Sequence, residues 1–235
     1  MIILAVDSST PVQGVAIVDE EKIWAENFLN TGLTHSEQLL PAINQTLKQA
    51  KITLADIDAF ALTQGPGSFT GLRIGMATIK GLAQVSGKKI VAIPTLDALA
   101  YNLWGYEGII CPILNARRNE VYTALYEMQA EEVVRISDYQ AVNPEELAEI
   151  LLKKEKPVTF LGDGVLVYKD LFAEKLSSKA CWAPLHNLMV RASSVGILAL
   201  QKLAQGIFDD LFTLEPMYIR RSEAEVKLEA RQCQR

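Results

Sequence analysis

The polar segment Asp7-Ser8-Ser9-Thr10-Pro11 follows a short apolar run and is the first part of the chain that could do chemistry. Backbone N–H groups and small hydroxyls in a turn suit phosphate oxygens, and a neighbouring Asp can hold a metal-bound water. Asp7, Ser8, Ser9 and Thr10 are therefore candidates for a nucleotide site. The same residue types also form turns in which the side chains satisfy only their own backbone. Taken alone, the segment fits this structural interpretation better.

The glycine-rich segment GPGSFTGLR, from Gly65 to Arg73, is the most distinctive in the chain. It looks like a phosphate loop but lacks the GK[ST] ending of a Walker motif. It also differs from the nucleophile elbow G-x-S-x-G, because Pro66 and Thr70 stand at the glycine positions around Ser68. Glycines before a serine are typical of a sharp turn from a strand into a helix, so we expect a structural role.

Side chains for metal binding or catalysis are scarce. The two histidines, His35 and His186, form no HxxxH, HExxH or His/Cys cluster, so a histidine-bound metal is not expected. A triad of Ser68 with one of these histidines stays open, because triad members need not be close in sequence, but nothing supports it. The turn Gly162-Asp163-Gly164 could touch a phosphate or could be an ordinary turn. We expect no catalytic residue, no metal and no cofactor.

The balance of charge argues against a chain that grips nucleic acid by itself. The net charge is -5 and the pI about 5.2, whereas affinity for a phosphate backbone comes mainly from Lys and Arg. Another subunit should supply most of any RNA contact. The best local candidates for such contact are the basic residues towards the C-terminus, Arg220, Arg221, Lys227, Arg231 and Arg235.

The cysteines and the N-terminal residues indicate the compartment. Three widely spaced cysteines without a CxxC pair predict neither a disulfide framework nor a zinc site. The apolar run after Met1 ends at Asp7, too early for a signal peptide or a membrane span. A cytoplasmic protein without a membrane segment is expected.

Hydrophobic periodicity predicts the elements that position these segments. Apolar runs predict strands at 2–6, 12–18, 23–28, 57–62 and 90–93. A helical period predicts one helix over Leu39–Ala50, after a capping-box spacing of Thr34 and Glu37, with Pro41 expected to kink its first turns. Further helices are predicted at 69–86, closed by Gly87, and from Pro94 to about Trp104.

The resulting order βββαβαβα indicates one ribonuclease-H-like lobe over residues 1–105. A smaller, looser C-terminal lobe is expected over 106–219 and a charged tail over 220–235. In the second lobe we predict strands at 109–114, 121–126 and 158–161 and helices at 144–154, begun by Asn143, and 192–203.

The helix predicted at 69–86 is unusual because Arg73 and Lys80 are its only charged residues. A helix with almost no polar face should be buried on most sides. It could be buried wholly within its own lobe. Alternatively one side meets the sheet of this lobe and the other meets a second protein, with Gly71, Gly75 and Ala83 allowing close approach. The continuity of the apolar residues favours the second interpretation.

Six segments, in order along nearly the whole chain, resemble the TsaB family, also called YeaZ. They are AVDSSTPVQGVAIV, THSEQLLP, QGPGSFTGLRIGMATIKGLA, PTLDALA, NARRNEVYTALY and EPMYIRRSE. The resemblance implies an α/β fold of two ribonuclease-H-like lobes in the actin/sugar-kinase-like (ASKHA) superfamily. It implies a non-catalytic partner subunit that dimerises with the threonylcarbamoyltransferase TsaD. The pair would support threonylcarbamoyladenosine modification of tRNA beside the anticodon.

Two further implications concern residues. Catalytic members of the wider family carry an HxxxH metal pair where this chain has Thr95 and Leu99, which cannot replace two imidazoles on a metal. The family's dimer surface, shared by self-pairing and pairing with TsaD, maps onto two helices. The interface residues expected here are Leu39, Leu40, Ile43, Leu47, Leu72, Gly75, Met76, Ile79 and Ala83.

The resemblance also implies that the ATPase TsaE joins the assembly and that tRNA is bound only through the complex, with a homodimer when the chain is alone. The alternatives are a glycoprotease-like peptidase and a small-molecule kinase of the same fold. Neither has an evident nucleophile, base or adenine pocket in the sequence. The sequence leaves open the oligomeric state, any weak nucleotide binding, and the residues that contact tRNA or TsaE.

Overall fold

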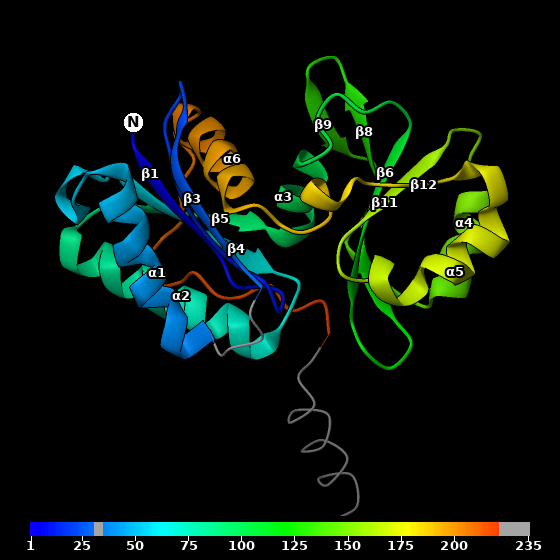
Figure 1. Ribbon diagram of the computed structural model, residues 1–235, viewed down its shortest axis with the longest axis horizontal. Helices are drawn as coiled ribbons and strands as arrows, with labels where there is room; N and C mark the ends of the chain where they lie inside the picture. Colours follow the sequence, from blue (N-terminus) through cyan, green and yellow to red (C-terminus); the bar gives the residue numbers. More distant parts are fainter. Residues whose placement is uncertain (31–34, 221–235) are drawn as a thin grey trace, which may run out of the picture.

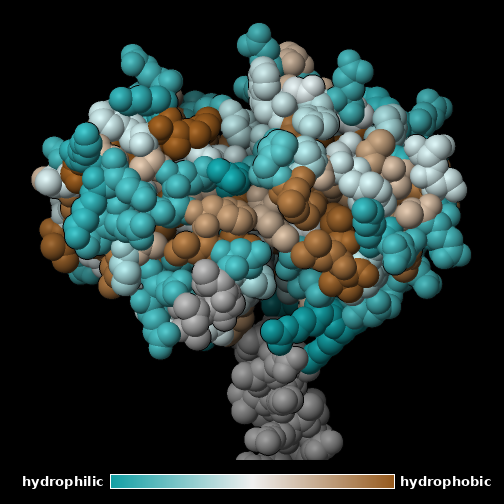
Figure 2. All heavy atoms as spheres, in the orientation of Figure 1, coloured by the Kyte–Doolittle hydropathy of each residue, from teal (hydrophilic) through white to brown (hydrophobic). Residues whose placement is uncertain are grey.

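The computed structural model describes residues 1–30 and 35–220 as two α/β lobes side by side (Figure 1). Several residues singled out above lie outside these ranges: the predicted cap Thr34, the basic residues Arg221, Lys227, Arg231 and Arg235, and Cys233. On the face seen in Figure 2, hydrophobic side chains gather in the middle, where the lobes meet, and polar ones cover the outer parts. Within the described ranges, no helix is both long and apolar enough to cross a membrane.

The first sheet has the strand order β3-β2-β1-β4-β5. Its strands are β1 (Ile3–Asp7), β2 (Gln13–Val18), β3 (Ile23–Leu29), β4 (Ala59–Gly65) and β5 (Lys89–Pro94). The first three form an antiparallel meander, and β1, β4 and β5 run parallel, with Val6 opposite both Val15 and Leu62. The predicted order of elements along residues 1–105, βββαβαβα, is therefore confirmed.

Helices cover both faces of this sheet. The long helices α1 (His35–Ala50) and α2 (Phe69–Ser86) pack on one face, and α3 (Thr95–Tyr101) and α6 (Ala192–Ala204) pack on the other. The pleat sends Leu4 and Val6 towards α1 and α2, and Ile3 and Ala5 towards the opposite face. Small residues on that face let α6 approach closely, since a Cβ at Gly196 would lie 2.5 Å from Val18 Cγ2.

Local capping signals set the ends of several helices. Ser68 caps α2, and Gly87 closes it in the left-handed conformation with φ 67°, as predicted. Asn143 begins α4 (Pro144–Leu152) by accepting a bond from the Glu145 N–H at 2.9 Å, also as predicted. Pro41 lies inside α1, which continues as one helix on both sides of it.

The second sheet has the order β10-β7-β6-β11-β12, with β8 paired to β6 and β9 to β8. Its strands are β6 (Ile109–Asn115), β7 (Val121–Thr123), β8 (Tyr126–Gln129), β9 (Glu132–Arg135), β10 (Gln140–Val142), β11 (Val158–Leu161) and β12 (Ala180–Trp182). The single strand predicted at 121–126 is two strands, because β7 and β8 pair with opposite ends of β6. Helix α5 (Val165–Leu176) and strands β9, β10 and β12 were not predicted from the sequence.

The chain crosses back to the first lobe before it ends. Helix α6 packs on β1 and β2, and beyond it the Asp209 N–H donates to the Ile90 carbonyl at 2.9 Å. Further on, the Met217 N–H donates to the Gln64 carbonyl at 2.8 Å. Residues 106–219 therefore contain the whole second sheet, but α6 and the residues after it pack on the first sheet. We call residues 205–220 the return segment.

Candidate functional site

The turn between β1 and β2 is organised around the buried carboxylate of Asp7. Its Oδ1 accepts from the Ser9 N–H at 3.0 Å, the Ser9 hydroxyl at 2.6 Å and the Thr63 hydroxyl at 2.7 Å. Its Oδ2 has no hydrogen-bond partner in the described part of the chain. Burial raises the pKa of Asp7, and the bonds from Ser9 and Thr63 oppose that rise. Asp7 therefore fixes the turn from within.

The same turn rests directly on the first half of α2. The Ser8 hydroxyl donates to the Gly71 carbonyl at 2.9 Å. A Cβ at Gly71 would collide with the Ser8 carbonyl oxygen, and one at Gly75 with the Ser8 hydroxyl. A Cβ at Gly67 would likewise collide with the Ser9 carbonyl. Gly67 and Gly71 therefore allow the turn's backbone to lie directly against this segment, which is a structural role, as expected.

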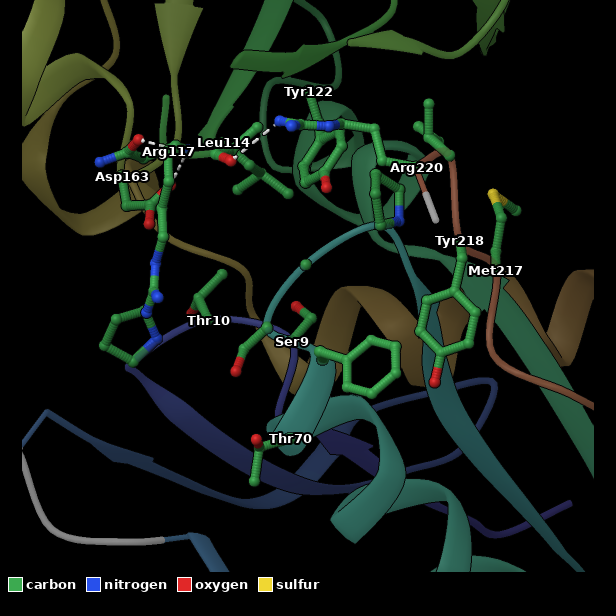
Figure 3. Close-up of a pocket in the computed structure, with 18 of the residues that line it drawn as sticks. Ser9, Thr10, Thr70, Leu114, Arg117, Tyr122, Asp163, Met217, Tyr218 and Arg220 are labelled. Atoms are coloured by element: carbon green, nitrogen blue, oxygen red, sulfur yellow. Dashed lines mark hydrogen bonds between the residues drawn. The ribbon is translucent and has the colours of Figure 1, made fainter. Parts of the chain in front are cut away.

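Between the lobes lies a cavity of about 650 Å³ (Figure 3). Ser9 and Thr10 are in its wall, while Asp7 and Ser8 are not. The full lining is Ser9, Thr10, Pro11, His35, Pro66, Gly67, Ser68, Phe69, Thr70, Leu114, Asn115, Ala116, Arg117, Arg118, Tyr122, Asp163, Met217, Tyr218, Ile219 and Arg220. Of the four residues predicted for a nucleotide site, two therefore reach the cavity. The other two hold the turn.

The opposite wall of the cavity is basic. Arg117 and Arg118 stand on the turn between β6 and β7, and Arg220 ends the return segment. Arg220 forms an ion pair with Glu120 and donates to the Ala116 carbonyl at 3.4 Å. In Figure 3, Arg117 extends from this wall towards the side that carries Thr10.

One acidic residue, Asp163, also lines the cavity. Its Oδ1 accepts from the Asn115 N–H at 2.9 Å, which ties the start of α5 to the end of β6. Burial raises the pKa of Asp163, and bonds from the backbone of Asn115 and Gly164 oppose the rise. Asp163 therefore helps to hold the basic wall in place, and its Oδ1 is already bonded to a backbone N–H group.

Aromatic rings close one end of the cavity. Tyr218 stacks on Phe69 with ring centroids 4.7 Å apart, and the Arg73 guanidinium lies 3.9 Å from the Phe69 centroid. Arg73 Nε also donates to the Tyr218 hydroxyl at 3.1 Å. The start of α2 and the return segment, far apart in sequence, are thus joined at the site.

The residues predicted for a partner surface mostly lie in the core of this chain. Buried against the first sheet are Leu39, Ile43, Leu72, Gly75, Met76, Ile79 and Ala83, and Leu47 is half-buried. Only Leu40, 57% exposed, faces solvent. The larger apolar side chains of α2 pack on the sheet, so most of the predicted interface residues are not on the surface of the single chain.

The opposite stripe of α2 faces outward and is formed by small or apolar side chains. Ala77, Gly81 and Val85 are exposed, with Val85 91% accessible, and Ile74 and Thr78 beside them are half-buried. A Cβ at Gly81 would meet no atom within 4 Å. These residues carry no charge, and the exposed Arg73 lies one helical turn before Ala77. An exposed stripe of small and apolar side chains is a candidate contact surface.

The other predicted residues take structural positions. Thr95 and Leu99 are fully buried. Ser68 accepts from the Gly71 N–H at 3.3 Å as the cap of α2, and His35 Nε2 lies 2.8 Å from the Thr10 carbonyl. His186 lies in a short 3-10 turn. In residues 1–30 and 35–220, no group of three or more His, Cys, Asp or Glu side chains is arranged to hold a metal ion.

The basic wall is what sequence reasoning missed. Sequence reasoning assigned no role to Arg117 and Arg118, and it indicated Arg220 only as one of several basic residues near the C-terminus that could contact RNA. The available signal was the pair of adjacent arginines directly after the strand predicted at 109–114, in a chain with a net charge of -5. Their meeting with Arg220 depends on the return segment and could not be read from spacing.

Comparison with known proteins gives a consistent result. The family model described as TsaD, tRNA N6-adenosine threonylcarbamoyltransferase, matches residues 30–228. The tRNA threonylcarbamoyladenosine biosynthesis protein TsaB of Bacillus subtilis is 33% identical over 227 residues, covering 97% of each chain. The structure of YeaZ from Pseudomonas aeruginosa has a TM-score of 0.79 at 26% identity, covering 92% of this chain and 99% of that one.

A more distant neighbour shows the fold alone. Component A of (R)-2-hydroxyglutaryl-CoA dehydratase from Acidaminococcus fermentans has a TM-score of 0.51 at 13% identity, covering 87% of this chain and 99% of that one. The likeness supports the two-lobed α/β fold expected from the sequence.

Proposed function

Because this chain belongs to the TsaB (YeaZ) family of tRNA threonylcarbamoyladenosine biosynthesis proteins, we propose that it acts as a non-catalytic partner of a TsaD-like threonylcarbamoyltransferase. In this role it contributes a binding surface and a stable lobe, and the partner contributes the chemistry. The uncharged outward stripe of α2 is the single observation that carries the proposal.

The positions matching the catalytic metal ligands support a non-catalytic role. The resemblance aligns Thr95 and Leu99 with two metal-binding histidines, and both residues are fully buried here. A buried hydroxyl and an isobutyl group offer no imidazole to a metal ion. Ser68, the one serine considered as a nucleophile, is occupied as a helix cap. These observations also weigh against a peptidase.

The outward stripe has the properties of a partner-binding helix face. Ala77 and Gly81 are small enough for a second backbone to approach, while Val85 offers exposed apolar area. Leu40 on the neighbouring helix α1 extends the apolar surface, since α1 and α2 pack against each other. Burying such a surface favours association, because apolar groups leave water and no charge is desolvated.

We expect the same face to serve a homodimer when the chain is alone and the TsaD-like subunit when both are present. A TsaE-like ATPase would join the assembly, and tRNA would be held chiefly by the complex. A cytoplasmic location follows from the proposed reaction.

The test is a matched pair of substitutions, Ala77→Arg on α2 and Ala173→Arg on α5. Both alanines are exposed on helices, so each change adds the same charge and bulk to a different lobe. Size-exclusion chromatography with light scattering reports pairing with the TsaD-like subunit, and a reconstituted reaction reports threonylcarbamoyladenosine in tRNA.

Ala77→Arg should abolish pairing and modification while thermal melting stays cooperative, and Ala173→Arg should preserve both. Normal pairing by Ala77→Arg would remove α2 from the interface. Modification of tRNA by this chain without its relative would refute the non-catalytic role.

A further inference from the structure

Arg117 and Arg118 are held in an unusual backbone conformation beside the inter-lobe cavity. With Asn119 they form three consecutive non-glycine residues in the left-handed region, with φ of 60°, 51° and 56°. Such a conformation is unfavourable for a non-glycine residue unless its surroundings compensate. Strain of this kind gathers at functional sites, so this turn calls for an explanation beyond joining β6 to β7.

The surroundings hold this turn firmly. The Arg117 N–H donates to Asn115 Oδ1 at 3.0 Å, and the Ala116 N–H donates to the Glu120 carbonyl at 3.0 Å. Asn143 Nδ2 donates to the Asn119 carbonyl at 3.3 Å. These bonds keep two guanidinium groups at the cavity wall without using the Arg117 side chain.

The cavity concentrates positive charge in an acidic protein. Its lining carries Arg117, Arg118 and Arg220 against the single carboxylate of Asp163, while the whole chain has a net charge of -5. Guanidinium groups suit phosphate because they donate several hydrogen bonds in a fixed planar geometry and stay charged. The wall therefore favours a phosphate-bearing ligand.

The remaining lining suits a nucleotide rather than an inorganic ion. Tyr122 and Tyr218 line the same cavity, and Tyr218 remains 40% exposed although it stacks on Phe69. Single-stranded RNA is recognised by stacking of unpaired bases on aromatic rings beside a basic path for the backbone. A volume of about 650 Å³ is on the scale of one nucleotide and excludes a duplex.

We propose that the inter-lobe cavity binds an unpaired nucleotide of the tRNA substrate, with its phosphate and the adjoining phosphates of the strand on Arg117, Arg118 and Arg220 and its base against Tyr122 or Tyr218. This inference rests on the proposed function, because that reaction makes RNA the substrate. The residues that line the cavity do not include those of the outward stripe of α2, so the two sites are distinct. A free nucleotide shares the same chemistry and is the competing source.

The test measures binding of the full chain to a fluorescein-labelled single-stranded decaribonucleotide by anisotropy, at about 50 to 200 mM KCl. Each phosphate neutralised on a single strand contributes a slope of about -0.7 to the logarithmic salt dependence. Three arginines therefore predict weak binding with a slope near -2. The double variant Arg117→Ala/Arg118→Ala should bind about tenfold more weakly, with a slope smaller in magnitude by about 1.4.

A matched control, Lys153→Ala/Lys154→Ala, removes the same charge at the exposed end of α4 and should bind the oligonucleotide like the wild type. Lys227→Ala/Arg231→Ala tests two of the other basic residues named above for RNA contact. The proposal expects binding to depend less on these two residues than on Arg117 and Arg118. If the double arginine variant does not melt cooperatively, Arg117→Gln removes one charge and should change the slope by about 0.7.

The proposal is overturned if the arginine variant binds like the wild type, if the wild type shows no binding, or if Lys227→Ala/Arg231→Ala alone loses binding. Competition with ATP and AMP distinguishes a nucleotide of RNA from a free nucleotide as the ligand of the cavity. Displacement of RNA by micromolar free nucleotide would assign the cavity to that ligand instead. The arginine variant should still pair with the TsaD-like subunit, so failure here leaves the proposed partner role standing.

Discussion

Alanine substitutions at the glycines of α2 should change the stability of the protein in opposite directions, depending on whether the glycine faces the core or faces outward. Gly81→Ala should stabilise the protein by about 0.5–1 kcal/mol, because a new Cβ meets nothing within 4 Å and alanine favours helix. At Gly75 the same gain is opposed by a collision with the Ser8 hydroxyl. That hydroxyl must rotate and give up its 2.9 Å bond to the Gly71 carbonyl.

The expected loss of stability at the inward positions, Gly75 and Gly71, depends on which atoms the new Cβ would meet. For Gly75→Ala, the lost buried hydrogen bond and local overpacking outweigh the gain, for a net destabilisation of about 1–2 kcal/mol. For Gly71→Ala, the obstacle is the backbone carbonyl of Ser8, which cannot rotate away, and His35 Cδ2 lies 3.2 Å from the new atom. A loss of about 3 kcal/mol is expected there.

Urea denaturation and thermal melting measure these differences. One kcal/mol corresponds to a shift in Tm of about 2–4 °C for a chain of this size. Melting should be repeated at two protein concentrations, because Gly81 lies on the proposed partner face and association would make Tm depend on concentration. Equal stability of the three variants would refute the reasoning, since it would mean that the turn does not rest on α2.

Three further outcomes are expected. Glu26→Ala should lower the free energy of unfolding by about 2–4 kcal/mol in urea, because it removes the acceptor for Arg191 Nη2 at 2.6 Å and for the start of α6; an unchanged midpoint would contradict this. Burial raises the pKa of Asp7 above its value in the unfolded chain, so its contribution to stability is present below the unfolded pKa and is lost as pH rises through the folded pKa. Asp7→Asn removes this titration, and its stability relative to the wild type should improve as the pH rises above the unfolded pKa of Asp, about 3.9, whereas a constant difference would show that Asp7 does not titrate abnormally. Burial raises the pKa of the Cys111 thiol to about 12, whereas Cys181 is exposed, so iodoacetamide at about pH 8 should modify Cys181 in the native protein and Cys111 only after unfolding, as mass spectrometry would show.

Local signals explain why some elements could be predicted from the sequence and others could not. Helix α2 lies between a serine cap and a left-handed glycine, both of which act within one turn of the helix ends. The parallel strand Val158–Leu161 was predicted at its true bounds, because a short apolar run buried on both sides carries its own signal. Helix α5 was missed, since it begins directly after a Gly-Asp-Gly turn and lacks a side-chain cap.

The return segment shows where local reasoning stops. Nothing in residues 205–220 indicates which lobe they contact, because they form neither a helix nor a long strand. Their position depends on bonds such as Met217 to Gln64 and on stacking of Tyr218 on Phe69. These contacts join positions far apart in the chain and exist only after both lobes have folded.

The sequence by itself determined the order of elements in residues 1–105, the family and the apolar character of α2. The helical period of 3.6 residues shows which side chains of α2 lie on the same stripe. It does not show which of two stripes without charged residues packs on the sheet. Only the tertiary structure decided that Met76 and Ile79 face the core while Ala77 and Gly81 face outward. It alone also brought Arg220 to the wall of the cavity, because the chain crosses back over the first sheet before it ends.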